Sequence, residues 1–270
     1  MSLLIHACIV NHNTSEFAEL ALRSLAVAHG PWLSSGRLRI TIMDNHSGDD
    51  GLSKLIMACD QLGAEFARSR WPAADTLVNS HGDVMRDFVA AHPSATHYLF
   101  ADADSYVLED DTVGRMAAEL DADDEAWAIQ ARFSWLEEHE GPGRSLDLWA
   151  GRIQQLRAGI DHALSGPFPG QHKARSHPAF SLVANTATFR RVADVLGLSA
   201  AMIIAADPEV AGFADTFGLA TLAMRTHGLH HRLSAATVGH YHGVSYQDPD
   251  QPLGRKLDDC RRRLASLRPI

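Results

Sequence analysis

The sequence is poor in cysteine and has no long apolar run, and both absences exclude classes of protein. The three cysteines, Cys8, Cys59 and Cys260, are too few and too far apart for a disulfide framework or a zinc ribbon. We therefore expect a reduced, cytoplasmic protein. No segment approaches the roughly 20 consecutive apolar residues that a membrane span needs, and the first residues lack the basic region and cleavage site of a signal peptide. We expect no transmembrane segment.

Basic residues are also in the minority, which argues against a nucleic-acid partner. The chain has 24 Lys and Arg against 33 Asp and Glu, a net charge of −9, whereas binding to a phosphate backbone needs clustered positive charge. The one basic cluster, Arg261–Arg263 with Arg268, is expected to be the solvated face of a short C-terminal helix. Neither GxGxxG nor GxxxxGK(S/T) occurs, so no glycine-rich phosphate loop of these kinds is available.

What the sequence does contain is the alternation of apolar and amphipathic segments that is typical of an α/β fold. Apolar residues make up 46% of the chain, an ordinary globular composition. Continuous apolar segments predict strands buried on both faces, and apolar residues at helical spacing predict the helices between them. Strands are predicted at Leu3–Val10, Leu38–Met43, His97–Ala101, Ala126–Phe133, Phe180–Ala184 and Leu233–Tyr241, and helices beginning at caps Asn13 and Asp111 and spanning Asn79–Ala91 and Asp215–His227.

Polar clusters follow three of the predicted strands, at residues 11–14, 44–47 and 102–105. Open α/β sheets bind their ligands along the carboxyl edge of the strands. The cluster Asp102-Ala103-Asp104 is the most informative, because two carboxylates at i and i+2 project to the same side of an extended chain and repel each other unless a cation lies beside them. Oxygen ligands suit Mg²⁺ or Mn²⁺. On this evidence alone, a solvated acidic turn is an equally good interpretation.

Four segments together resemble a known family. HYLFADADS (97–105) resembles the DxD motif of GT-A glycosyltransferases, and the order of the remaining segments is similar to glycosyltransferase family 2. Residues 3–13 resemble that family's opening strand and Asn-containing turn, IMDNHSGDDG (42–51) its second-strand signature, and NSHG (79–82) its donor-side helix start. The resemblance covers residues 3–110 well and residues 176–246 loosely.

The resemblance implies a fold and a division of labour. We expect a GT-A fold with a mostly parallel central sheet and helices on both faces, in one domain over residues 1–270. Residues 1–110 would form the nucleotide-binding half, residues 111–246 the acceptor-side half and residues 247–270 a C-terminal tail. By the same resemblance, Asp44 would bind the nucleotide base, Asp102 the ribose and the metal, and Asp104 the metal, with Asn11, Asn13, Asn45, Ser47, His81 and Ala103 completing the donor site.

The second half adds two expected site residues. GHYHGVSY (239–246) resembles the His-x-x-Gly-x-Ser element in which a histidine completes the metal site, and His240 has the matching spacing; His242 lies two residues further on. GFADTFG (212–218) resembles the acidic pair before the acceptor-side helix, with Ala214 in place of the first acid. Asp215 could then deprotonate an acceptor hydroxyl in an inverting reaction, or simply cap the following helix.

The sequence therefore predicts a Mn²⁺- or Mg²⁺-dependent enzyme that transfers a sugar from a nucleoside diphosphate donor, UDP-linked by resemblance, to a hydroxyl-bearing acceptor. Two alternatives stay open. A sugar nucleotidyltransferase would use a similar sheet, but the Gly-rich basic loop that it needs for a triphosphate is missing. A non-catalytic nucleotide-sugar-binding protein would be consistent with the acid that is missing at Ala214.

Overall fold

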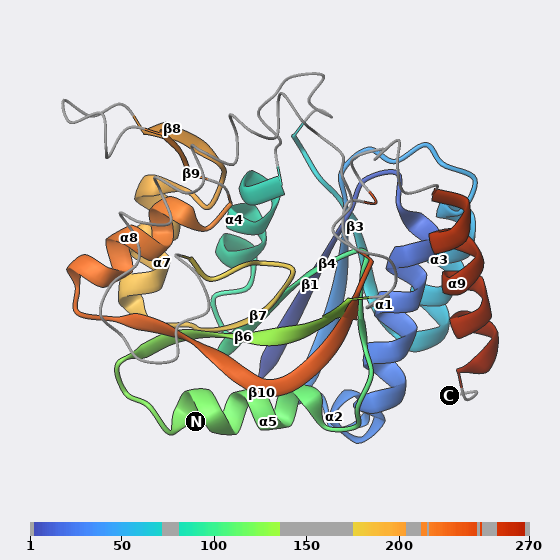
Figure 1. The fold of residues 1–270 in the computed structure, drawn as a ribbon, viewed down its shortest axis with the longest axis horizontal. Coiled ribbons are helices and arrows are strands. Elements are labelled where there is room, and N and C mark those ends of the chain that lie inside the picture. Colours follow the sequence, from blue (N-terminus) through green and yellow to red (C-terminus); the bar gives the residue numbers. More distant parts are fainter. Residues whose placement is uncertain are drawn as a thin grey trace.

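A computed structural model describes residues 3–71, 81–135, 175–203, 212–214, 216–241, 244 and 253–267. Its centre is an eight-stranded sheet with the order β3-β2-β1-β4-β7-β6-β10-β5 (Figure 1). Four neighbouring pairs are parallel and three are antiparallel, so the sheet is mostly parallel, as expected. The strands are β1 (Ile5–Asn11), β2 (Leu38–Asp44), β3 (Glu65–Arg68), β4 (His97–Asp102), β5 (Ser105–Val107), β6 (Ala126–Trp135), β7 (Phe180–Ala184) and β10 (His230–His240).

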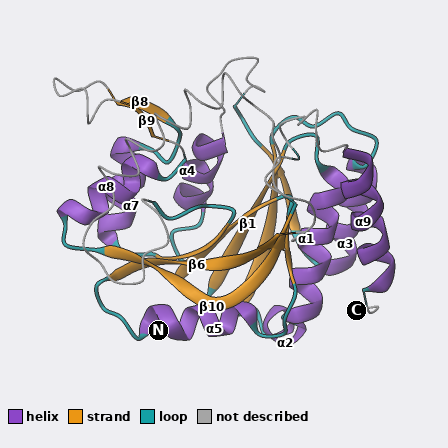
Figure 2. Cartoon of the chain, viewed as in Figure 1, coloured by secondary structure: helices purple, strands orange, loops and turns teal. Residues whose placement is uncertain are grey.

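Helices cover both faces of this sheet (Figure 2). One face packs against α1 (Ser15–Ala28), α3 (Leu52–Leu62) and α5 (Thr112–Asp121), and the other against α4 (His81–Ala91), α7 (Ala187–Leu196) and α8 (Gly218–Thr226). Three more elements lie outside these layers: α2 (Gly30–Ser34), α9 (Leu253–Ser266) and the two-stranded sheet of β8 (Ala201–Ile203) and β9 (Gly212–Ala214). None of the helices in the described ranges is long and apolar enough to cross a membrane.

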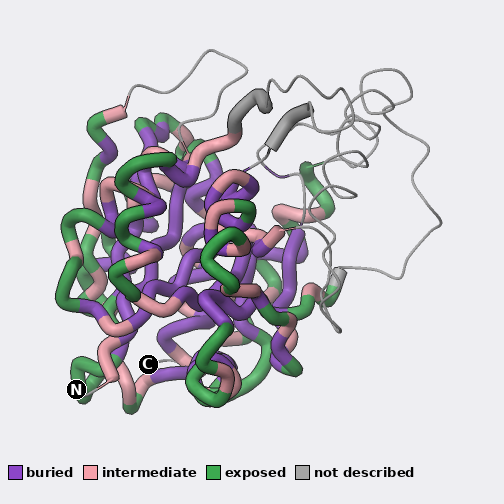
Figure 3. Tube along the Cα trace, turned by 90° about the vertical axis from the view of Figure 1, so that its left-hand side faces the viewer, coloured by how far each residue is buried: buried purple, intermediate pink, exposed green. Residues whose placement is uncertain are grey.

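β1 shows why the apolar segments are continuous rather than alternating. Ile5 and Ile9 pack into the core on the α1 side, whereas Cys8 and Val10 pack into the core on the α4 side. All seven residues of the strand are buried, and Figure 3 shows the buried segments in the middle of the molecule. The prediction of strands buried on both faces is therefore confirmed. The three cysteines are buried and free, which agrees with the absence of a disulfide framework.

Of the two predicted helix caps, Asn13 is wrong, because the N-cap of α1 is Thr14, and Asp111 is right in position but makes no side-chain capping bond. Asn13 adopts a left-handed conformation with φ 54° and accepts a hydrogen bond from Gly48 N. The first residue of α1, Ser15, instead donates its backbone N–H to Asp49. Asp111 does occupy the N-cap position of α5, but its side chain makes no capping bond; His29 Nε2, at the end of α1, accepts from Val113 N instead, at 3.0 Å.

In the C-terminal basic cluster, Arg261 and Arg262 are exposed, as expected for a solvated helix face, but Arg261, Arg262 and Arg263 all pair with carboxylates, and Arg268 lies outside the described residues. α9 packs against α1, and the Arg261 guanidinium lies 2.7 Å from both carboxylate oxygens of Glu16. Arg263 binds Asp259 at 2.6 Å and covers the ring of Tyr106. Asp259 is a local partner within the same helix, whereas Glu16 and Tyr106 lie far away in the chain and could not be recognised as partners from the sequence. The scattered Gly, Pro and charged residues at 137–175 predict an excursion over the sheet, and residues 137–174 lie outside the described residues.

Candidate metal and nucleotide site

The register of the sheet brings the predicted polar clusters to one edge. Asn11, the last residue of β1, pairs with Asp44, the last residue of β2. On the other side of β1, Val10 pairs with Asp102 at the end of β4. The strands are parallel, so their carboxyl ends coincide, and the turns after β1, β2 and β4 lie side by side.

Asp102, Asp104 and His240 converge at this edge. β10 runs antiparallel to β5, and its last residue, His240, pairs with Ser105 directly after the acidic turn. His240 Nε2 lies 3.2 Å from Asp104 Oδ1. One potential ligand atom from each of the three residues lies within 4.8 Å of the others. The structure therefore brings together the three residues that the sequence predicted as metal ligands.

Burial and mutual charge set the protonation of this group. Burial raises the pKa of Asp102, and the positive partners His81 and His240 oppose that rise only in part. Burial also acts to raise the pKa of Asp104, but the hydrogen bond and charge of His240 outweigh it, so the pKa of Asp104 is lowered. Burial favours neutral His240, yet Asp104 and Asp102 raise its pKa above 6.5. Without a metal, the imidazolium form of His240 is the cation that the two carboxylates stabilise.

The donor set fits Mn²⁺ or Mg²⁺. It comprises two carboxylates and one imidazole, a combination that suits Mn²⁺ in particular, since Mg²⁺ prefers oxygen ligands alone. Asp104 and His240 are almost fully buried, whereas the Asp102 side chain keeps 24% of its surface exposed. Within the described ranges, a buried oxygen of Asp102, Oδ1, has no hydrogen bond and lies 3.4 Å from His81 Nε2. This oxygen is available to a cation at the open side of the group.

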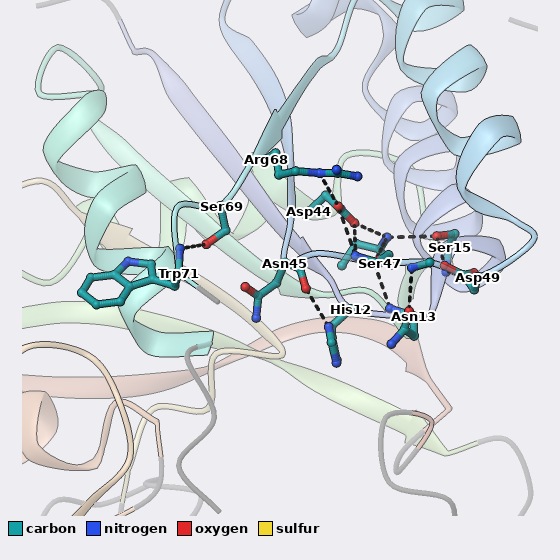
Figure 4. A network of polar contacts seen from close by, with 12 residues as sticks. His12, Asn13, Ser15, Asp44, Asn45, Ser47, Asp49, Arg68, Ser69 and Trp71 are labelled. Atoms are coloured by element: carbon teal, nitrogen blue, oxygen red, sulfur yellow. Dashed lines mark hydrogen bonds and ion pairs between the residues drawn. The ribbon is translucent and has the colours of Figure 1, made fainter. Parts of the chain in front are cut away.

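A second cluster, formed by Asn11, Asp44 and Ser47, joins the turns after β1 and β2 (Figure 4). Asn11 Nδ2 donates to Asp44 Oδ1 at 3.1 Å and to Ser47 Oγ at 3.0 Å. The Ser47 backbone N–H reaches both oxygens of Asp44, at 3.4 and 3.3 Å. Each of the three side chains is buried. Their hydrogen-bond partners among the described residues are protein groups, so one role of these residues is to hold the two turns together.

Arg68 lies over the outer side of Asp44. Its Nε is 3.4 Å from Asp44 Oδ2, and its side chain is 55% exposed while that of Asp44 is fully buried. Ser69 and Trp71 follow directly (Figure 4), with Ser69 Oγ accepting from Trp71 N at 3.0 Å. A nucleotide base can reach Asp44 only if Arg68 moves aside or takes part in the contact. The role of Asp44 toward the base stays a prediction.

The remaining residues predicted for the nucleotide-sugar site differ in which of their groups are available for binding. Asn13 is exposed, but its backbone N–H and side-chain oxygen bind Ser47 Oγ and Gly48 N. The backbone carbonyl of Asn45 contacts His12 Nδ1 at 2.7 Å. His81 lies against Asp102, as described above. The side chain of Ala103 belongs to the hydrophobic core on the α1 side, so only its backbone is available to a donor.

Asp215 and His242 lie outside the described residues. Their surroundings still correct one expectation: the N-cap of α8 is Phe217 and the helix begins at Gly218, so the interpretation of Asp215 as the helix cap is wrong. Phe217 has a left-handed backbone conformation, with φ 69°. It directly precedes the helix and lies two residues after Asp215, where the sequence predicted the helix to begin.

Sequence reasoning missed three side chains at this edge. Arg68 ends a strand of only four residues, and Arg175 follows a segment without recognisable pattern. The charge of Arg175 acts on Asp102, and its Nη1 donates to Thr216 O at 2.7 Å. The ring of Phe133 lies 5.0 Å from that of His240 at a tilt of 31°. No local sequence pattern marks these three side chains, because their positions at this edge depend on tertiary contacts.

Comparison with known proteins identifies the fold. No protein-family model and no curated protein matches the sequence. The structure is similar to that of glucosyl-3-phosphoglycerate synthase from Mycobacterium tuberculosis in complex with Mn²⁺ and UDP-glucose, with a TM-score of 0.54 and 15% identity over 98% of this chain and 78% of that chain. It is also similar to S. aureus TarS 1–349, with a TM-score of 0.52 and 13% identity over 98% of this chain and 72% of that chain.

Both proteins are GT-A-like glycosyltransferases. This chain has the GT-A fold. The mostly parallel sheet, the helices on both faces and the acidic turn after β4 agree with the fold that the four sequence motifs predicted. In this GT-A fold, the carboxyl edge carries the cluster of Asp102, Asp104 and His240 beside the turns after β1 and β2.

Proposed function

We propose that this chain is a metal-dependent glycosyltransferase that transfers a sugar from a nucleoside diphosphate donor to a hydroxyl-bearing acceptor. The observation that carries the proposal is the convergence of Asp102, Asp104 and His240 at the carboxyl edge of a GT-A sheet. The similarity to an enzyme in complex with Mn²⁺ and UDP-glucose supports a UDP-sugar as the donor.

The three residues would hold Mn²⁺ or Mg²⁺ on the open side of Asp102. A divalent ion bound there stabilises the negative charge that develops on a diphosphate leaving group, acting as a Lewis acid. The chain has a net charge of −9 and no glycine-rich phosphate loop. Cationic assistance for a diphosphate must therefore come from a metal and from single side chains such as Arg175, whose positive charge already acts on Asp102.

The turns after β1 and β2 would hold the nucleoside. The buried contacts among Asn11, Asp44 and Ser47 fix the positions of both turns before a donor arrives, which lowers the entropy cost of binding. Asp44 would face the base, with Arg68 either displaced or stacked beside it. The exposed side chain of Asn13 and the buried side chain of Asn45 lie on the same two turns and would contact the rest of the nucleoside.

Asp215 is our candidate for the general base of an inverting transfer. It comes directly after β9 and three residues before α8 begins, and it does not serve as the cap of that helix. We expect Asp215→Asn to retain donor affinity and to lower turnover by roughly 10² or more, the usual loss when a general base is removed. Calorimetry of donor binding and a steady-state transfer assay measure the two quantities. Near-normal turnover would rule out this role.

One experiment tests the function and separates its rivals. The full chain is incubated with UDP-glucose and other nucleotide sugars, with and without Mn²⁺, and the release of nucleoside diphosphate is measured. A glycosyltransferase releases diphosphate slowly with water and faster with an acceptor. A binding protein shows affinity without turnover, and a nucleotidyltransferase consumes a nucleoside triphosphate and a sugar phosphate instead. Metal-independent binding or no binding at all contradicts the proposal.

A further inference from the structure

A second group of potential metal ligands lies at the opposite end of the sheet. His6 is the second residue of β1, Glu65 is the first residue of β3, and His92 follows the last residue of α4. One potential ligand atom from each of the three lies within 4.8 Å of the others. His6 and Asn11, at the carboxyl edge, are five positions apart in β1, which corresponds to about 16 Å along the strand. The group is therefore separate from the candidate donor site.

Neighbouring contacts hold these side chains together. The His6 and His92 rings lie 3.9 Å apart between centroids, and both pack against the ring of Phe88. Between β1 and β3, the hydroxyl of Thr41 on β2 lies 3.0 Å from His6 Nε2 and donates to Glu65 Oε2 at 3.2 Å. Ring packing and a hydrogen bond thus hold His6, ring packing holds His92, and the hydrogen bond from Thr41 holds Glu65.

The chemistry of the group suits a transition metal. Two imidazoles and one carboxylate leave one tetrahedral position for water, and Glu65 is exposed while His6 is buried, so the group is open on one side only. Burial lowers the pKa of His6 to about 3 and also lowers that of His92, so both rings are neutral and can bind a metal. In a tetrahedral zinc site, ligand atoms lie about 3.4 Å apart, which small side-chain rotations can provide here.

We propose that His6, Glu65 and His92 form a second divalent metal site, selective for Zn²⁺ over Mg²⁺, that ties β1, β3 and the end of α4 together. Selectivity follows from the two imidazoles, which Mg²⁺ binds poorly. Thr41 orients two of the ligands from the adjacent strand. The positive charge of Arg39, which pairs with His6 in the sheet, acts on both histidines and lowers the affinity for a cation.

The test uses the full chain carrying Asp104→Asn and His240→Ala, so that the candidate donor site cannot contribute. Zinc binding is measured by calorimetry, and cobalt binding by the visible absorption that a tetrahedral Co²⁺ site gives. Glu65→Gln and His92→Gln each remove one ligand. We expect each to weaken Zn²⁺ affinity by more than roughly tenfold, at least the loss caused by removing an outer-shell partner, and to remove the tetrahedral cobalt spectrum.

Two further variants serve as controls. Arg39→Gln should tighten zinc binding, because it removes a positive charge that repels the metal ion. If the contacts of His6, Glu65 and His92 had only a structural role, Arg39→Gln would not increase the zinc affinity. His227→Gln changes an exposed histidine at the end of α8 and should have no effect. Glu65 is exposed at the start of a strand, so Glu65→Gln keeps the test valid even if His92→Gln unfolds the chain. Zinc affinity that is unchanged in Glu65→Gln, or a background protein that binds no zinc, overturns the proposal.

Discussion

At the scale of single residues, two of the Asp–His pairs in the described part of the chain differ in burial. Asp104 and His240 are both almost fully buried and lie 3.2 Å apart, whereas Asp123 is 22% exposed and contacts both His230 and Arg232. A surface pair exchanges its partners with water at little cost, but a buried pair that loses one charge leaves the other unpaired. A divalent cation can therefore take the place of the ion-pair contact between Asp104 and His240, and this applies to the buried pair rather than to the surface pair.

The pH dependence of metal binding follows from this pair. Burial lowers the pKa of His240, but the hydrogen bond and charge of Asp104, with the charge of Asp102, raise it above 6.5 overall. A metal binds only the neutral imidazole. Affinity for donor in Mn²⁺ should therefore be full well above that raised pKa and should fall as the pH drops through it.

We expect His240→Ala to remove most of this pH dependence together with much of the affinity, measured by calorimetry between about pH 5.5 and 8. His230→Ala, which alters the surface pair, should leave both in place, and so should His242→Ala. An unchanged pH profile in His240→Ala would show that the imidazole is not a ligand. A damaging His242→Ala would place the ligand two residues further along.

Asp44 has a stability role that can be measured apart from any ligand. Both of its oxygens accept hydrogen bonds in a fully buried position. We expect Asp44→Asn to lower the free energy of unfolding by about 1–3 kcal/mol, because an amide group would face the donors Asn11 Nδ2 and Ser47 N. Urea denaturation measures this loss. Asp60→Asn, an exposed change in α3, is the control and should have little effect; equal stability of the two variants contradicts the structural role.

At the scale of elements, the sequence predicted the helices and strands in which apolar residues form a recognisable pattern. β1, β2, β4 and β7 were found because most of their residues are apolar and buried. β5 has only three residues, too few to show a period, and it exists because it pairs with β10. The sequence shows the charged face of α9 but not its packing against α1. That packing depends on the contact of Arg261 with Glu16, about 245 positions earlier in the chain.

The start of α4 offers an element-scale prediction. Gly82 follows His81, and a Cβ added there would lie 2.3 Å from the backbone of Ser199, which cannot move as a flexible side chain can. Gly82→Ala should therefore destabilise the fold by about 1–3 kcal/mol or more through overpacking, and it should shift His81 away from Asp102. Thermal unfolding tests the first effect. Gly254→Ala in α9, where no atom lies within 4 Å, should be neutral or stabilising.

At the scale of the whole molecule, the candidate site results from sheet topology. The parallel register of β2, β1 and β4 aligns three polar turns at one edge of the sheet. The antiparallel pairing of β10 with β5 positions His240 at the same edge. The first part could be predicted, because carboxyl ends of parallel strands coincide. The pairing of β10 with β5 could not be derived from local pattern, and His240 was predicted through family resemblance alone. The contributions of Arg68 and Arg175 depend on tertiary positions that no local pattern records.

The central claim is that Asp102, Asp104 and His240 hold the metal through which a nucleotide-sugar binds. The most direct test is calorimetric titration of UDP-glucose into the full chain, with Mn²⁺ and with chelator, for the unaltered protein, Asp104→Asn and the surface control Asp123→Asn. We predict Mn²⁺-dependent binding that Asp104→Asn abolishes and Asp123→Asn retains, with unchanged far-UV circular dichroism in both variants. Equal Mn²⁺-dependent affinity in Asp104→Asn and the unaltered protein would contradict the account.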